Sequence, residues 1–128
     1  MPVKYLSPEW IEEYNAVLAK DDAVRAALKG KSAALQMVVS GAPQGEVRYW
    51  LRIADGSASA GLGDLDGADV TISQSYETSA AVAQGELDGQ KAFTQGKVKI
   101  QGKMLKMMQL RAPLAQVQTA MSALDTEY

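Results

Sequence analysis

The sequence contains neither histidine nor cysteine. Histidine is the commonest general base and the commonest metal ligand, so its absence excludes Ser-His triads and typical zinc sites. The absence of cysteine excludes disulfides and thiolate metal ligation. An enzyme built from this chain would depend on carboxylates, lysine, tyrosine or serine, and the sequence shows no paired constellation of these. It therefore favours a binding protein and predicts no catalytic residue, no cofactor and no metal.

The sequence also lacks any apolar run long enough to span a bilayer, and no signal peptide precedes Ser7. We therefore expect a cytoplasmic protein. The net charge is only −2, although residues 91–128 carry six Lys or Arg and only two acids. A nucleic-acid surface usually combines a stronger basic surplus with interleaved aromatics, and only Phe93 lies among these basic residues. Nucleic acid is therefore not an expected partner.

Length and composition indicate one globular domain. The chain has 128 residues, of which 47% are apolar and 22% charged, values that are ordinary for a soluble fold with a single core. We therefore expect residues 1–128 to form a single domain.

The N-terminal segment has clear helix signals. Ser7 is a favourable N-cap, and Pro8 suits the first turn of a helix. The pair Asp21–Asp22 is expected to interrupt or re-cap the helix before it ends near Gly30. Apolar spacing suggests that Trp10 and Tyr14 pack against a sheet; contact with a ligand is the alternative.

Three segments that follow alternate apolar and polar residues, the period of strands with one buried face. Their apolar positions are Ala33, Leu35, Met37 and Val39; Val47, Tyr49, Leu51 and Ile53; and Ala58, Ala60 and Leu62. Residues 41–45 and the pair Asp55–Gly56 are turn signals. The alternation predicts a sheet that is covered on one side and wetted on the other. Trp50 falls on the wetted face, either stacked by arginines or docking a partner.

Residues 63–69, GDLDGAD, superficially suggest a calcium loop. They depart from the EF-hand order, in which three oxygen ligands precede the glycine and a glutamate closes the loop. Asp-Gly segments are also common in connections because they turn well. We therefore interpret this segment as a connection between strands.

The last third alternates short elements and ends in an apolar helix. Val70 and Ile72 predict a fourth strand, two short helices follow through Val82 and Phe93, and residues 97–101 predict a fifth strand. A stripe at spacings of three and four then continues to the C-terminus: Met107, Leu110, Leu114, Val117, Met121 and Leu124. Pro113 must kink or break this helix. Its methionines either fill core gaps or line a surface that accepts varied ligands.

Residues 93–104, FTQGKVKIQGKM, followed by a Met-rich helix, resemble the signature of the sterol carrier protein-2 (SCP-2) lipid-binding domains. Weaker resemblance extends back to about Arg25, through residues 49–56 and 68–72. The resemblance implies an α+β fold with a five-stranded, largely antiparallel sheet, helices packed on one face and an enclosed apolar tunnel. Two departures stand out: the usual Asn-Met is Lys103–Met104 here, and the chain ends without a peroxisomal signal, so peroxisomal import is not expected.

The resemblance implies a non-enzymatic carrier of fatty acids, fatty acyl-CoA or other lipids and sterols. The expected tunnel wall is formed by Val47, Tyr49, Leu51, Ile53, Leu62, Ile72, Val82, Phe93, Ile100, Met104, Met107, Met108 and Leu114. Gln95 would either bind a ligand head group or cap the short helix before it. Lysines 97, 99, 103 and 106 would attract an acidic head group or an anionic membrane, or form a solvated face.

The alternative is a structural module with a filled core. Its Met-rich C-terminal helix would serve as a protein-interaction surface, and the heptad-like spacing from Met107 to Leu124 permits dimerization. The sequence therefore leaves monomer and dimer open.

Overall fold

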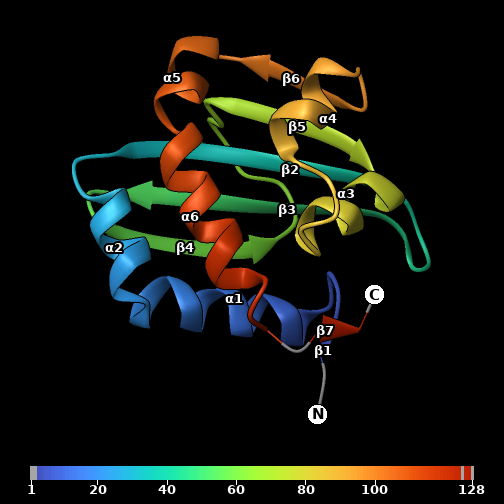
Figure 1. Cartoon of the computed structure of the whole chain (residues 1–128), viewed down its shortest axis with the longest axis horizontal. Helices are drawn as coiled ribbons and strands as arrows, with labels where there is room; N and C mark the ends of the chain where they lie inside the picture. Colours follow the sequence, from blue (N-terminus) through green and yellow to red (C-terminus); the bar gives the residue numbers. More distant parts are fainter. Residues whose placement is uncertain (1–2, 125, 128) are drawn as a thin grey trace.

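Five strands form one sheet, and the helices cover one of its faces (Figure 1). The structure is a computed structural model that describes residues 3–124, 126 and 127, with side chains except at positions 89 and 90. The strands are β2 (Ser32–Ala42), β3 (Gly45–Ala54), β4 (Ser57–Leu62), β5 (Val70–Ser75) and β6 (Val98–Gly102). Their order is β4-β3-β2-β5-β6, and only the β2–β5 pair is parallel. The predicted α+β class and largely antiparallel five-stranded sheet are confirmed.

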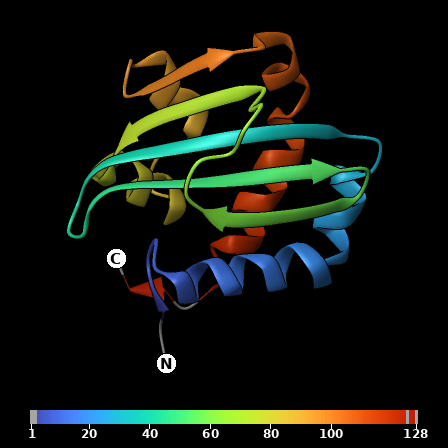
Figure 2. The ribbon, with the colours of Figure 1, turned by 180° about the vertical axis from the view of Figure 1, so that it is seen from behind.

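Six helices and a small second sheet complete the described chain. The helices are α1 (Pro8–Lys20), α2 (Asp22–Leu28), α3 (Tyr76–Ala83), α4 (Gly89–Thr94), α5 (Met104–Gln109) and α6 (Arg111–Met121). Strands β1 (Val3–Lys4) and β7 (Thr126–Glu127) pair in parallel near the chain ends. Figure 2, seen from behind, shows that the other face of the large sheet carries no helix.

Side-chain caps begin four of the helices, and in α4 the Asp88 carboxylate accepts from the Lys91 amide at 3.3 Å. The Ser7 hydroxyl accepts from the Trp10 amide at 3.2 Å, and the Asp21 carboxylate accepts from the Val24 amide at 2.9 Å. Ser75 caps α3 in the same way. Both N-terminal caps predicted from the sequence are confirmed, because short oxygen-bearing side chains satisfy amides that the first turn leaves unpaired.

Sheet register follows from turn chemistry and apolar alternation. Asp55 and Gly56 both have positive φ, 45° and 85°, the backbone that a two-residue hairpin with native twist requires. Because β5 lies beyond β2, the connection at residues 63–69 must cross the uncovered face of the sheet (Figure 2). Gln36 fixes it there: its amide donates to the Gly63 carbonyl and accepts from the Leu65 amide. This face is therefore only partly wetted, and Gln36 is buried.

Trp50 lies on this same face and is half-buried. Its indole lies on Gly61 of β4, where a Cβ atom would come within 2.4 Å of Trp50 Cζ2. The absence of a side chain at this glycine thus lets the indole ring pack directly on the backbone of the neighbouring strand. The arginine stacking expected from the sequence stays a prediction.

Helix α1 lies along the edge strand β4. The Asn15 amide group accepts from the Ala60 amide at 2.8 Å and donates to the Ala60 carbonyl at 2.9 Å. These backbone groups face away from β3, so Asn15 satisfies an edge that would otherwise be open for pairing with another chain.

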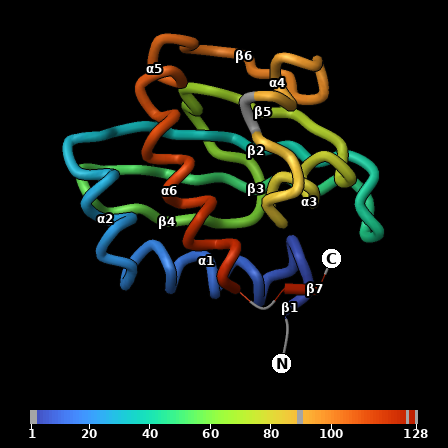
Figure 3. Tube along the Cα trace, viewed as in Figure 1, coloured from blue at the N-terminus to red at the C-terminus, as the bar shows by residue number. Residues whose placement is uncertain are grey.

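The apolar C-terminal segment is two helices, because the chain bends at Leu110. Pro113 lies in the first turn of α6, where its missing amide leaves no hydrogen bond unmade. The predicted break is confirmed. The trace in Figure 3 shows α6 running from α5 past α2 to α1, and Leu110, Val117 and Met121 are buried along it.

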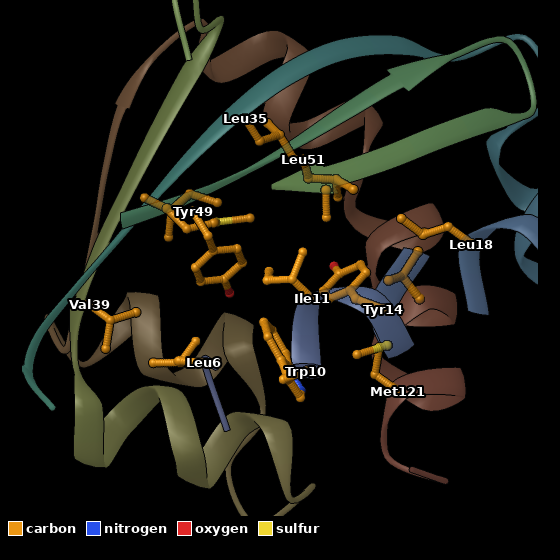
Figure 4. Close-up of a cluster of buried hydrophobic side chains, with 14 of the residues drawn as sticks. Leu6, Trp10, Ile11, Tyr14, Leu18, Leu35, Val39, Tyr49, Leu51 and Met121 are labelled. Atoms are coloured by element: carbon orange, nitrogen blue, oxygen red, sulfur yellow. The ribbon is translucent and has the colours of Figure 1, made fainter. Parts of the chain in front are cut away.

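The core lies between the sheet and α1 (Figure 4). Trp10 is its aromatic centre. Ring centroids of Tyr5, Tyr14 and Tyr49 lie 5.0, 5.2 and 5.5 Å from that of Trp10, all edge-on. The expected packing of Trp10 and Tyr14 against the sheet is confirmed, and such pairs add to the free energy gained from burial alone.

Candidate functional site

One apolar row crosses the covered face of all five strands. Register pairs Leu62 of β4 with Tyr49, Tyr49 with Met37, Met37 with Ile72, and Ile72 with Ile100 of β6. Four of these five residues belong to the tunnel wall predicted from the sequence. Neighbouring strands lie about 4.8 Å apart, so the row spans roughly 19 Å, a length that suits an extended acyl chain. We call it the cross-sheet row.

The cross-sheet row is less tightly covered than the row beside it. The neighbouring row runs through Leu51, Leu35 and Val70, which are at most 1% exposed. In the cross-sheet row the two ends emerge: Ile100 is half-buried and Leu62 is 43% exposed. The flanking wall residues Val47, Leu51 and Ile53 are buried in the core. The covered face is thus solid along one row and open at both ends of the next.

Three half-buried apolar residues lie on the helices that cover the sheet. They are Met107 of α5, Leu114 of α6 and Val82 of α3, and all are packed against the core without being enclosed by it. Gln118 ties two of these helices together, donating to the carbonyls of Val82 and Ala83 at 3.0 Å each. Leu114 lies one turn before Gln118, so its side chain projects from the same face of α6.

Helix α5 presents an apolar surface to solvent. Leu105 is 69% exposed, Met108 62% and Met104 41%, and we call these three residues the α5 patch. Single exposed apolar side chains are ordinary, but three within two turns of a short helix are not. Phe93, which is 41% exposed, belongs to α4. Because β6 separates α4 from α5, Phe93 and Met104 lie at opposite ends of that strand (Figure 1).

Gln95 is exposed just after α4. Backbone hydrogen bonds end this helix. The Gly96 amide donates to the Phe93 carbonyl, and the Lys97 amide donates to the Ala92 carbonyl. Gly96 has a φ of 78°. Within the described part of the chain the Gln95 side chain makes no hydrogen bond. The end of α4 therefore does not depend on that side chain, and its contact with a head group stays a prediction.

Gly102 closes the motif where β6 meets α5. Its φ is 114°, and a Cβ atom there would lie 2.3 Å from the Asp69 carbonyl oxygen. Only glycine permits this close approach. The position of α5, and of the α5 patch with it, thus depends on a glycine.

Asp69 attaches this corner to the sheet. Its carboxylate accepts from the Ala34 amide at 2.9 Å and pairs with Lys103 at 3.0 Å and Lys106 at 3.5 Å. The Ala34 bond and then Lys103 lower the pKa of Asp69 below its usual value. Asp64, in the same connection, pairs with Arg48 at 3.1 Å. Two acids of the calcium-like segment are thus engaged by cations, and no group of three or more potential metal ligands gathers among residues 3–124, 126 and 127.

Two residues that were not part of the predicted tunnel wall lie in the same layer. Met37 occupies the middle of the cross-sheet row, and its apolar alternation already placed it on the covered face. Tyr14 reaches the same layer from α1, as Figure 4 shows. Helical spacing could place Tyr14 on the buried face of α1 but could not say which strand it would meet.

Comparisons with known proteins can now be set beside this geometry. The sequence model of the SCP-2 sterol transfer family matches residues 14–115. The chain belongs to the SCP-2 sterol transfer family. The resemblance seen in residues 93–104 is thereby confirmed. A search of curated proteins finds no match for the chain.

Solved structures of SCP-2 proteins share the fold. A conserved hypothetical protein from Thermus thermophilus, described as possibly a sterol carrier protein, has a TM-score of 0.80 at 19% identity, covering 98% of this chain and 92% of that one. A crystal structure of sterol carrier protein 2 has a TM-score of 0.78 at 21% sequence identity, and the match covers 94% of this chain and 99% of that one. Palmitated SCP2L2 from Aedes aegypti has a TM-score of 0.64 at 22% sequence identity, and the match covers 88% of this chain and 94% of that one.

The membership in this family supports a role in carrying sterols or other lipids. Across the described residues, no helix is both long and apolar enough to cross a membrane.

Proposed function

We propose that this protein is a non-enzymatic carrier that holds a fatty acid, a fatty acyl-CoA or another extended lipid between its sheet and helices. The observation that carries the proposal is the cross-sheet row, whose end residues Leu62 and Ile100 are not fully buried, together with half-buried Met107, Leu114 and Val82 on the covering helices. The apolar tunnel predicted from the sequence would follow this row. Family membership and the palmitated relative from Aedes aegypti support the ligand class.

The energetics suit reversible loading. A chain of about sixteen carbons gains roughly 12 kcal/mol from burial, at about 0.8 kcal/mol per methylene. Association costs of roughly 4–15 kcal/mol offset much of this gain. We therefore expect micromolar affinity, near −8 kcal/mol, which permits release as well as uptake.

The α5 patch supports exchange with a membrane. Lys106 belongs to α5 and Lys103 directly precedes it, both of them paired with Asp69, and exposed Lys97 and Lys99 lie before and within β6. Apolar residues beside cations suit an anionic lipid surface, where burial and electrostatic attraction act together. We propose transient contact of α5 with anionic membranes during loading.

Part of the surface that the dimerization alternative would use is buried within the protein. Leu110, Val117 and Met121, which belong to the heptad-like stripe, are buried against the protein's own core. A second copy would have to use the α5 patch instead. Sizing of the delipidated protein tests this alternative, because an obligate dimer that persists without lipid would favour it.

Native mass spectrometry of the purified protein tests the carrier function. We expect co-purified lipid, or stoichiometric uptake of added palmitate after delipidation. A clean apo mass that takes up neither palmitate nor palmitoyl-CoA would contradict the proposal. A cytoplasmic place of action is part of the same proposal, and cell fractionation tests it.

A further inference from the structure

The two outer strands of the large sheet, β4 and β6, differ in how their edges are covered. Helix α1 lies along β4, and Asn15 binds both backbone groups of Ala60 there. Among the described residues, no strand or helix runs along the outer side of β6 between α4 and α5 (Figures 1 and 2). An uncovered edge of this kind is a template on which another strand can pair.

Backbone direction along β6 shows which groups this edge offers. The Lys103 amide donates to the Asp69 carbonyl, on the β5 side, at 2.9 Å. Backbone groups alternate in direction along a strand, so the odd-numbered residues of β6 also bond to β5. The amides and carbonyls of Val98 and Ile100 therefore point away from the sheet. Within the described part of the chain, no helix end, loop or side chain bonds to them.

The side chains of this edge alternate in character. Val98 and Ile100 lie on the covered face, and half-buried Ile100 is the last residue of the cross-sheet row. Lys99 lies on the opposite face, Lys97 comes two residues before it, and both are exposed. A strand paired here would place every second residue beside Ile100 and the residues between them beside the lysines. The edge therefore fits a segment that alternates apolar and acidic residues.

A second copy of this chain fits the edge poorly. When two β6 strands pair antiparallel with Ile100 opposite Ile100, Lys97 lies opposite Lys103. When Val98 lies opposite Ile100, Lys99 lies opposite Lys99. Like charges directly opposite each other destabilise a strand pair, and edge lysines commonly protect against self-pairing. The same lysines attract a strand that carries carboxylates, so charge favours an acidic partner over a second copy.

We propose that β6 is a docking edge for an extended protein segment in which acidic and apolar residues alternate, added antiparallel as a further strand beyond β6. The outward amides and carbonyls of Val98 and Ile100 bind its backbone. Lys97 and Lys99 bind its carboxylates, and its apolar side chains extend the cross-sheet row past Ile100. Such strand addition takes affinity from backbone bonds and specificity from alternate side chains. The assignment goes beyond the carrier function and does not rest on it.

A labelled peptide of alternating valine and glutamate, capped at both ends, tests the docking edge by fluorescence anisotropy. The valine opposite Ile100 would form a hydrogen-bonded pair with it, so the valine amides face β6 and the glutamate amides face away. N-methylation of the valines should lower the affinity about tenfold or more, whereas N-methylation of the glutamates should change it less than about twofold. Equal binding of the two methylated peptides would overturn the proposal.

Charge reversal gives a second test. Lys99→Glu should weaken binding of the valine-glutamate peptide about fivefold and strengthen binding of a valine-lysine peptide, because a cross-strand attraction becomes a repulsion. Lys20→Glu, exposed at the end of α1, changes the net charge equally and is the matched control. Equal losses in the two variants would reveal a nonspecific charge effect and overturn the role of Lys99.

Hydrogen exchange followed by NMR locates the bound peptide. The Ile100 amide should exchange about tenfold more slowly at a peptide concentration about ten times the Kd. The Ala60 amide, which Asn15 already binds at the opposite edge, should not change. Unchanged exchange at Ile100 in the saturated complex would place the peptide elsewhere and overturn the docking edge.

The outcomes separate this assignment from membrane contact and from lipid carriage. If anionic vesicles bind the wild type but not Lys97→Glu/Lys99→Glu, while the peptide binds neither protein, the lysines serve the membrane and the docking edge is overturned. Palmitate uptake is measured on the same wild-type protein. Uptake without peptide binding leaves the carrier function standing, and peptide binding without uptake leaves the docking edge standing.

Discussion

The two ends of the sheet are built from the same alternating pattern but are covered differently. At the β4 end, α1 lies along the edge strand, Asn15 pairs with Ala60, and the aromatic cluster around Trp10 fills the layer. At the β6 end, Ile100 is half-buried and the α5 patch faces solvent. We call these the packed end and the open end, although Leu62 at the end of β4 is itself 43% exposed. Burial at the packed end stabilises the fold, which allows the open end to keep apolar surface available for exchange.

The comparison predicts the largest loss of stability in the solid row next to the cross-sheet row. Leu51→Ala removes a fully buried side chain and leaves a cavity, so the free energy of unfolding should fall by about 2–5 kcal/mol. Urea titration measures the change. Met108→Ala, at the open end, is the matched control and should change stability by less than about 0.5 kcal/mol. Equal losses for the two variants would remove the distinction between the ends.

A glycine pair at the two ends of β6 gives the next largest effect. Gly102→Ala places a Cβ against the Asp69 carbonyl at a positive φ and should cost about 2–3 kcal/mol. Gly96→Ala also has a positive φ but meets no atom within 4 Å, so it should cost about 1 kcal/mol. Thermal unfolding measures both. A smaller cost for Gly102→Ala than for Gly96→Ala would show that α5 is not held by this close approach.

The edge at the packed end is expected to depend on one amide side chain. Asn15→Ala leaves the Ala60 amide and carbonyl without their partner and should cost about 1–2 kcal/mol. It should also raise self-association, measured by light scattering, because the β4 edge becomes available. Glu12→Ala, on the exposed side of α1, is the control, and an equal effect there would contradict the role of Asn15.

Acid should weaken the attachment at the open end. The pKa of Asp69 is lowered in the folded state, so its stabilisation is present above the unfolded value, about 3.9, and is lost as pH falls through the folded value. Stability measured against pH should therefore fall below about pH 4 more steeply in wild type than in Asp69→Asn. Lys103→Gln keeps the Ala34 bond and should show an intermediate slope. Identical profiles for all three would contradict the assignment.

The smallest change in stability, and the largest in transfer, is expected for the α5 patch. Leu105→Ser and Met108→Ser should leave the unfolding midpoint nearly unchanged, because both side chains already contact water. The double variant should slow the transfer of a fluorescent fatty acid between anionic vesicles. An unchanged transfer rate would show that exchange does not use α5.

Much of the fold could be predicted from local patterns. The caps at Ser7 and Asp21, the Asp55–Gly56 hairpin and the break before Pro113 depend on residues close together in the sequence. The crossing connection could not be predicted in the same way. Gln36 reads as an outward-facing strand residue, and only the placement of β5 beside β2 brings residues 63–65 over it.

The candidate site, like the fold, could be predicted from the sequence only in part. Alternation placed Tyr49, Ile72 and Ile100 on the covered face, and the structure joins them in one row. The motif suggested Phe93 and Met104 together, yet β6 holds them at opposite ends, because a strand separates its flanking residues by about 3.3 Å per position.

The sequence by itself determined the elements, their buried faces and the family, because these depend on period, caps and turn residues that local chemistry dictates. Only the tertiary structure decided which buried faces are fully covered. Tyr14 and Tyr49 come from elements far apart in the chain, and only the fold brings both rings edge-on to Trp10 beside the cross-sheet row.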